Sequence, residues 1–316
     1  MNTTIPGLHH VTAITGDAGR NFDFYAGLLG LRLVKRTVNF DDPAIYHLYY
    51  GDAAGSPGSV ITFFVWPNGA RGRQGAGQVA ITSFAIPQAA LGYWVARLVQ
   101  HAVRYEGPTR RFDEQVLAFR DPDGLSLELV ARQGLEHGQS WDGAAVPPEY
   151  AIQGIHGVTL WEENPGRTAA MLNDHLAFRL VREEDDRVRF AAGDEVADVV
   201  QAHGFWRGEV GVGIVHHVAW RTPDDEEEQQ WREKLTRLGY DVTPVRDRQY
   251  FRSIYFREPG GVLFEIATDL PGFAVDEPAE RLGTHLQLPP WLEPHRSRIE
   301  QSLPPLQLPA WNVPGT

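Results

Sequence analysis

The sequence repeats itself, and this repetition limits the possible fold more than any other feature. Gly7-Leu8-His9-His10-Val11-Thr12 recurs 147 residues later as Gly154-Ile155-His156-Gly157-Val158-Thr159. A second pair, 137 residues apart, relates residues 119–124 to residues 256–261. Self-similarity at a fixed spacing is typical of a chain built from copies of one supersecondary unit. The two spacings predict four similar units, at about 7–66, 78–132, 153–203 and 213–269, in which units 1 and 2 were duplicated as units 3 and 4.

Each unit begins with a strand of alternating character, such as Leu8–Thr15, and continues with a helix and further strands. This order predicts a βαβββ module and an α+β fold class. In unit 4 we expect a helix with Thr222 as its N-cap, Pro223 at its first position and an acidic first turn. Strands near 252–256 and 261–268 are expected to close that unit.

The repeats also predict the domain organisation. Two modules form an N-terminal domain at 1–132, and two form a C-terminal domain at 153–269. The segment 133–152 is rich in Gly and Pro, as a linker would be, and the tail 270–316 contains nine prolines. We expect this tail to lie extended over the surface, anchored by Trp291 and Trp311, with a short helix near 293–301.

Composition excludes several classes of function. The formal net charge of −12 argues against binding to nucleic acid or to an anionic membrane. The chain has no cysteine, so any metal must be held by nitrogen and oxygen ligands. The N-terminal residues lack the apolar segment of a signal peptide, and we expect a cytoplasmic protein.

Two histidine pairs begin the first strands of units 1 and 4, His9-His10 and His216-His217. Successive residues of a strand point to opposite faces, so one histidine of each pair faces the interior and the other serves packing or supports it. His10 has Gly157 as its copy, and we assign Ala80 as the copy of His217. Glu265 is copied as Glu128. If the second histidines are ligands, units 1 and 4 hold one complete site, and Glu128 is a relic.

We therefore take His10, His217 and Glu265 as candidate metal ligands. A single strand histidine is usually a satisfied buried polar group, but these three differ from their copies together. Two imidazoles and one carboxylate form the triad that suits non-haem Fe(II), while Mn(II) or Zn(II) could also bind. The position in unit 1 that mirrors Glu265 falls near Thr62, which offers no strong ligand. Its absence favours a three-ligand site with open coordination positions.

These motifs resemble those of the vicinal oxygen chelate superfamily, the group of glyoxalases, bleomycin-resistance proteins and extradiol dioxygenases. Residues 7–12, 215–219 and 262–269 are similar to its hydroquinone 1,2-dioxygenase and ring-cleaving dioxygenase branch. The resemblance covers nearly the whole chain. It implies two tandem domains with half-barrel sheets and a metal between the first and fourth modules, held by His10, His217 and Glu265.

The resemblance also implies a set of residues around the substrate, which here are Tyr255, Arg248, His9, His216 and Thr12. The copy of Tyr255 is Ala118, so this hydroxyl occurs only in the unit that keeps the candidate ligands; a core tyrosine is the alternative. The copy of Arg248 is Arg111, which leaves a structural salt bridge in both units as an alternative.

The activity implied is an Fe(II)-dependent ring-cleaving dioxygenase that acts on a hydroquinone or a related dihydroxylated aromatic with dioxygen. One alternative keeps the same ligands but uses a redox-silent metal, as glyoxalase-type isomerases and thiol transferases do. Another is a drug-binding resistance protein without turnover. The sequence leaves the oligomeric state open, a homo-oligomer included.

Overall fold

The computed structural model describes residues 4–135, 141, 143–306 and 308, and within them each of the four units has the predicted βαβββ order. Unit 1 contains β1 (Leu8–Thr15), α1 (Ala18–Phe22), β2 (Arg32–Asn39), β3 (Asp42–Gly51) and β4 (Val60–Val65). Unit 2 contains β5 (Gln78–Pro87), α2 (Leu91–Gln100), β6 (Tyr105–Arg111), β7 (Glu114–Arg120) and β8 (Ser126–Arg132).

The second half of the chain repeats this order. Unit 3 contains β9 (Ile155–Glu162), α3 (Pro165–Ala170), β10 (Arg179–Glu184), β11 (Arg187–Ala192) and β12 (Glu195–Gln201). Unit 4 contains β13 (Val215–Thr222), α4 (Asp225–Arg237), β14 (Arg246–Asp247), β15 (Arg252–Arg257) and β16 (Leu263–Thr268). The tail adds α5 (Arg296–Ser302), close to the predicted short helix.

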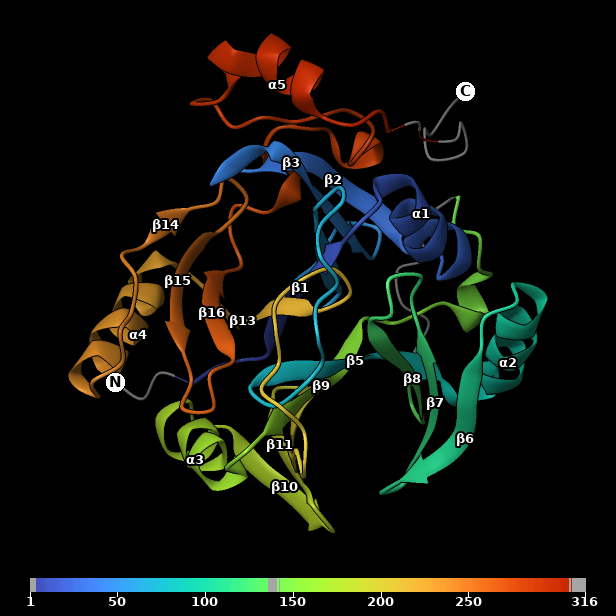
Figure 1. Cartoon of the computed structure of the whole chain (residues 1–316), viewed down its shortest axis with the longest axis vertical. Helices are drawn as coiled ribbons and strands as arrows, with labels where there is room; N and C mark the ends of the chain where they lie inside the picture. Colours follow the sequence, from blue (N-terminus) through green and yellow to red (C-terminus); the bar gives the residue numbers. More distant parts are fainter. Residues whose placement is uncertain (1–3, 136–140, 142, 307, 309–316) are drawn as a thin grey trace.

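The sixteen strands of the described residues form two eight-stranded sheets, in the orders β14-β15-β16-β13-β1-β4-β3-β2 and β10-β11-β12-β9-β5-β8-β7-β6. Each sheet curls into a half-barrel with its helices on the outside (Figure 1), which confirms the predicted fold class. The first sheet joins units 1 and 4 through the antiparallel pair β1–β13, and the second joins units 2 and 3 through β5–β9. Residues more than 200 positions apart in the sequence therefore share one sheet. The domain boundaries at 132, 152 and 269 stay a prediction.

The core lies between the outer helices and the convex faces of the sheets. Alternation along each strand sends one set of side chains to this core and the other set to the concave face. Trp94 of α2, Trp231 of α4 and Trp220 of β13 are all fully buried there. Burial of one such side chain stabilises the fold by about 1.5–3 kcal/mol. The concave faces are consequently free to carry polar residues.

The tail does more than cover the surface. Phe273 and Leu282 are buried in a cluster with Tyr49 of β3, Tyr250 of the loop before β15 and side chains from other strands of the first sheet. That cluster also includes Ala219 and Ala267, which follow His217 and Glu265 by two residues and so share their face. The tail thus fills part of the concave side of the first half-barrel.

Of the two expected anchors of the tail, Trp291 lies in the part of the chain that the structure describes. Trp291 is 45% exposed and makes a T-shaped ring contact with Phe40, while Trp311 lies outside the described residues. Lys35 is fully buried instead, and its ammonium group contacts carboxylates of Asp276 and Glu277 in the tail. No helix in the described ranges is long and apolar enough to cross a bilayer.

The strand register corrects the copy assigned to His217. Thr12 lies opposite His217 in the first sheet, whereas its copy Thr159 lies opposite Ile81 in the second. The counterpart of His217 is therefore Ile81, and the assignment to Ala80 was wrong by one residue. Unit 4 has one more residue between His217 and Tyr255 than unit 2 has between Ile81 and Ala118. One constant spacing therefore cannot align both pairs.

The start of α4 also differs from the expectation. Thr222 is the last residue of β13, and Asp224 is the N-cap, whose carboxylate accepts a hydrogen bond from the backbone N–H of Glu227 at 2.9 Å. An aspartate is at least as good an N-cap as a threonine, and its negative charge also suits the helix dipole.

Candidate metal centre

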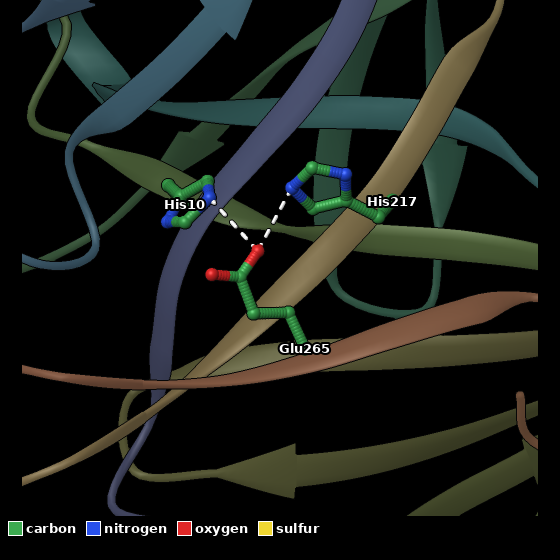
Figure 2. A group of neighbouring side chains, drawn as sticks. All are labelled: His10, His217 and Glu265. Atoms are coloured by element: carbon green, nitrogen blue, oxygen red, sulfur yellow. Dashed lines mark ion pairs between the residues drawn. The ribbon is translucent and has the colours of Figure 1, made fainter. Parts of the chain in front are cut away.

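Three side chains converge on the concave face of the first sheet, His10 from β1, His217 from β13 and Glu265 from β16 (Figure 2). These strands are neighbours in the sheet. The Oε2 atom of Glu265 lies 2.8 Å from Nε2 of His217 and 3.4 Å from Nε2 of His10. All three residues are buried, and their candidate ligand atoms lie within 4.8 Å of one another.

Two β-bulges explain why both histidines of each pair have a distinct place. Leu8 pairs with Trp220 and His10 with Ala219, which leaves His9 as the extra residue of β1. In the same way His216 is the extra residue of β13. A bulge turns the following side chain relative to a regular strand and is often found next to active sites.

The two bulge histidines, His9 and His216, each contact the neighbouring candidate ligand through Nδ1. Nδ1 of His9 lies 2.8 Å from Nδ1 of His10, and Nδ1 of His216 lies 2.8 Å from Nδ1 of His217. The His9 ring also donates a hydrogen bond to the backbone carbonyl of Thr268, which leaves Nδ1 of His9 as an acceptor. In the tautomer in which Nδ1 of His10 donates to Nδ1 of His9, the Nε2 atom of His10 keeps its lone pair toward Glu265. Such outer partners fix the tautomer of a metal-binding histidine.

Burial and charge set the protonation states of the group. Burial lowers the pKa of His9 and of His216 to about 3, helped by the neighbouring histidine in each case. Burial alone would raise the pKa of Glu265, but His10 and His217 outweigh it and hold this pKa well below its usual value. Oε1 of Glu265 accepts a short hydrogen bond from the hydroxyl of Ser253. Glu265 is therefore an anion beside neutral bulge histidines.

The donor set fits a divalent cation. Oε2 of Glu265 is buried, and the polar atoms that face it are Nε2 of His217 at 2.8 Å and Nε2 of His10 at 3.4 Å. A cation between two imidazole nitrogens and one carboxylate oxygen would satisfy all three lone pairs at once. Two histidines and one carboxylate suit Fe(II), Mn(II) or Zn(II) and leave coordination positions open.

The other predicted site residues lie around these three. Tyr255 is directly opposite Glu265 on β15, and its hydroxyl accepts a hydrogen bond from Nε of Arg248 at 3.2 Å. Arg248 also donates to Asp41 in the β2–β3 turn at 3.0 Å. Burial and the nearby Glu265 raise the pKa of Tyr255, so its hydroxyl keeps its proton. Thr12 lies opposite His217, two residues after His10.

The second half-barrel carries a different group at the equivalent place. Both carboxylate oxygens of Glu128 accept hydrogen bonds from Arg111, and Ser83 donates to it at 2.8 Å. Ala118, the copy of Tyr255, leaves room for this arginine. A Cβ atom on Gly157 would lie 2.1 Å from the carbonyl oxygen of Val196, so no side chain fits there.

Sequence reasoning missed His47, on β3. Its Nε2 atom lies 2.8 Å from the hydroxyl of Thr62, and its Nδ1 atom lies 2.8 Å from the hydroxyl of Tyr49. The pairing of Tyr49 with Thr62 corresponds to that of Tyr255 with Glu265. The available signal was the two-residue spacing of His47 and Tyr49 on a strand next to the one that holds Thr62.

Comparison with known proteins gives consistent results. Residues 7–129 and 154–266 match the model of the Glyoxalase/Bleomycin resistance protein/Dioxygenase superfamily, as the resemblance predicted. The chain is 48% identical to the "Putative ring-cleaving dioxygenase MhqO" of Bacillus subtilis, over 96% of this chain and 97% of that protein. It is 34% identical to the chlorohydroquinone/hydroquinone 1,2-dioxygenase of Sphingobium indicum, over 92% and 93%. A crystal structure of a dioxygenase described as putative, from Bacillus subtilis, superposes with a TM-score of 0.93 at 48% identity and covers 97% of this chain and 99% of that one.

Proposed function

This chain belongs to the glyoxalase/bleomycin resistance protein/dioxygenase superfamily, and from that premise we propose that it is a ring-cleaving dioxygenase. In this proposal His10, His217 and Glu265 hold one divalent metal ion, and the substrate is a hydroquinone or a related dihydroxylated aromatic. The observation that carries the proposal is the convergence of the buried Oε2 atom of Glu265 and two buried imidazole nitrogens, whose candidate ligand atoms lie within 4.8 Å of one another.

Fe(II) is the metal that this donor set favours among the candidates, because two histidines and one carboxylate with open positions are typical of non-haem Fe(II) oxygenases. The names of two relatives, a ring-cleaving dioxygenase and a hydroquinone 1,2-dioxygenase, support the same choice of chemistry. A bound Fe(II) would supply Lewis acidity toward a phenolic oxygen and a one-electron route to dioxygen.

The residues of the chain would bind and orient the substrate around that centre. Arg248 carries a permanent positive charge that offsets the charge of a deprotonated substrate oxygen. Tyr255 accepts from Arg248, so its own hydrogen is free to be donated to an oxygen of the substrate. His9 and His216 are engaged with the ligand histidines, and we assign them the role of fixing ligand orientation.

The experiment compares the wild type with Glu265→Gln and His10→Ala after anaerobic loading with Fe(II). We expect both variants to lose bound iron and oxygen consumption with hydroquinone. Glu128→Gln is the matched control, since this carboxylate is engaged with Arg111 in the other sheet, and it should keep both. Full oxygen uptake in either triad variant would refute the ligand assignment. Substrate conversion without oxygen uptake would favour the glyoxalase-type reaction.

A further inference from the structure

Four side chains form one continuous hydrogen-bonded chain on the unit 1 side of the candidate metal centre. The hydroxyl of Tyr49 lies 2.8 Å from Nδ1 of His47, and Nε2 of His47 lies 2.8 Å from the hydroxyl of Thr62. The Thr62 hydroxyl in turn lies 2.8 Å from that of Thr12. All these distances are those of good hydrogen bonds.

The chain ends at the metal centre. Thr12 follows His10 by two residues and lies opposite His217 across the β1–β13 pair, so it shares the concave face with both. Residues opposite each other in such a pair have Cβ atoms about 4.5–5.5 Å apart. A molecule bound at the open positions of the centre would therefore lie on the same face as the Thr12 hydroxyl.

Each hydroxyl has one hydrogen, and a neutral imidazole has one as well, so a fully bonded chain has two possible directions. Burial, together with the nearby His10 and His217, lowers the pKa of His47 well below its usual value, which keeps the ring neutral. In one direction every group donates toward Thr12. In the other, every group donates toward Tyr49, and the hydrogen of Tyr49 itself is left without an acceptor.

The surroundings of Tyr49 favour the first direction. Tyr49 is 2% exposed, and among the residues that the structure describes its hydroxyl has no hydrogen-bond partner other than His47. Its ring is packed against Tyr250 and Phe273, and within the described residues neither Tyr255 nor Arg248, which lie near enough to affect its pKa, makes a hydrogen bond with its hydroxyl. A buried donor without a partner is costly, so Tyr49 donates to His47. Nε2 of His47 then donates to Thr62, and Thr62 donates to Thr12.

We infer that the hydrogen bonds of these four side chains all point toward the metal centre. Thr12 then presents a free O–H and selects a ligand oxygen that accepts a hydrogen bond, a phenolate rather than a phenol. The inference rests on the proposed function for the ligand class and extends it to the protonation state that is recognised. Thr12 would contact the ligand, while Thr62, His47 and Tyr49 act as positioning residues.

The test uses 4-nitrophenol, a phenol whose ionisation is followed by its absorbance, bound to protein loaded with redox-silent Zn(II). The apparent pKa of the bound probe is measured in the wild type, Thr12→Val and Tyr49→Phe. A hydrogen bond to an ionised oxygen is among the stronger ones, so we expect Thr12→Val to weaken phenolate binding roughly tenfold and raise the bound pKa by about one unit. Tyr49→Phe should raise the pKa of the bound probe by a smaller amount, because the remaining hydrogen bonds can then reverse their direction.

Two matched control variants distinguish a loss of the hydrogen-bond direction from a general disturbance of the fold. Thr159→Val makes the same change at the copy of Thr12 in the other sheet, and Tyr50→Phe removes a buried hydroxyl that has no partner in the described chain. Neither control should shift the pKa of the bound probe. An unchanged probe pKa in Thr12→Val, or equal shifts in Tyr49→Phe and Tyr50→Phe, would overturn the inference.

The outcome is distinguishable from failure of the proposed function. Bound zinc is measured in every sample, and a wild type that retains none contradicts the metal site itself. The same titration on metal-free protein then still tests the polarity, because the hydrogen-bonded chain includes none of the three candidate ligands. Thermal unfolding confirms that each variant is folded.

Discussion

Replacing His9 by phenylalanine should weaken metal binding without removing a ligand. His9 is 4% exposed, its Nδ1 atom lies 2.8 Å from Nδ1 of His10, and it can accept the hydrogen that this atom carries when Nε2 of His10 binds a metal. In the His9→Phe variant that hydrogen has no acceptor. The metal-free protein can avoid the loss, because His10 can move its hydrogen to Nε2 and donate it to Glu265. The metal-bound protein cannot, since Nε2 must then offer its lone pair to the metal.

The unsatisfied hydrogen-bond donor therefore destabilises only the metal-bound state. An unsatisfied buried donor costs about 1–3 kcal/mol, which corresponds to roughly 5- to 150-fold in affinity. Loss of a partner behind a metal-binding histidine typically weakens binding by about 10- to 100-fold. We expect the affinity of His9→Phe for Zn(II) or Fe(II) to fall within that narrower range.

Competition with a chromophoric chelator under anaerobic conditions measures this affinity. His9→Asn is the informative second variant, because the amide oxygen lies near the position of Nδ1 and can accept the same hydrogen bond; its affinity should stay close to that of the wild type. His156→Phe makes the identical change at the copy of His9, which is 3% exposed in the other sheet. Equal affinities of His9→Phe, His156→Phe and the wild type would refute the reasoning.

Three further predictions follow from the same structure. Tyr255→Phe should retain its metal while kcat with hydroquinone falls about 100-fold, because a hydroxyl donor near the substrate is lost; steady-state oxygen uptake with metal analysis measures both. Lys35→Met should lower the free energy of unfolding by about 3 kcal/mol in urea titrations, since it leaves two carboxylates of the tail without their buried cation. Burial and the neighbouring Glu258 raise the pKa of Glu162 from 4.5 to about 8. Ionisation of this carboxyl therefore lowers the free energy of unfolding as the pH rises from about 4.5 to about 8. The free energy of unfolding of Glu162→Gln, measured relative to the wild type in urea titrations, should therefore increase by about 2 kcal/mol from pH 5 to pH 8. The exposed control Glu163→Gln should show no such increase.

The internal repeat explains why so much of the fold could be predicted from one sequence. Four copies of a pattern that alternates with period two must form similar strands, and short connections restrict how they pair. The repeat also identified the candidate ligands, because His10 differs from Gly157 while the surrounding residues agree. The structure brings His10, His217 and Glu265 together on one sheet, as the pattern indicated. Whether they hold a metal stays a prediction.

The features that were missed depend on register and on distant contacts. The bulges at His9 and His216 shift the pairing by one residue, and nothing local in the sequence marks where a strand gains an extra residue. For the same reason the copy of His217 was misplaced. His47 was overlooked because its hydrogen bonds to Thr62 and Tyr49 exist only once β3 and β4 have paired.

The two half-barrels differ in what balances the same buried carboxylate. Glu265 and Glu128 occupy equivalent positions, and each is almost completely removed from solvent. A buried carboxylate needs a compensating cation, because desolvation otherwise costs several kcal/mol. In the second sheet Arg111 supplies that charge in contact with Glu128. In the first sheet the corresponding arginine, Arg248, is bonded to Tyr255 and Asp41 instead. The carboxylate of Glu265 faces the Nε2 atoms of His10 and His217 instead, which is why we propose a divalent metal ion as its compensating cation.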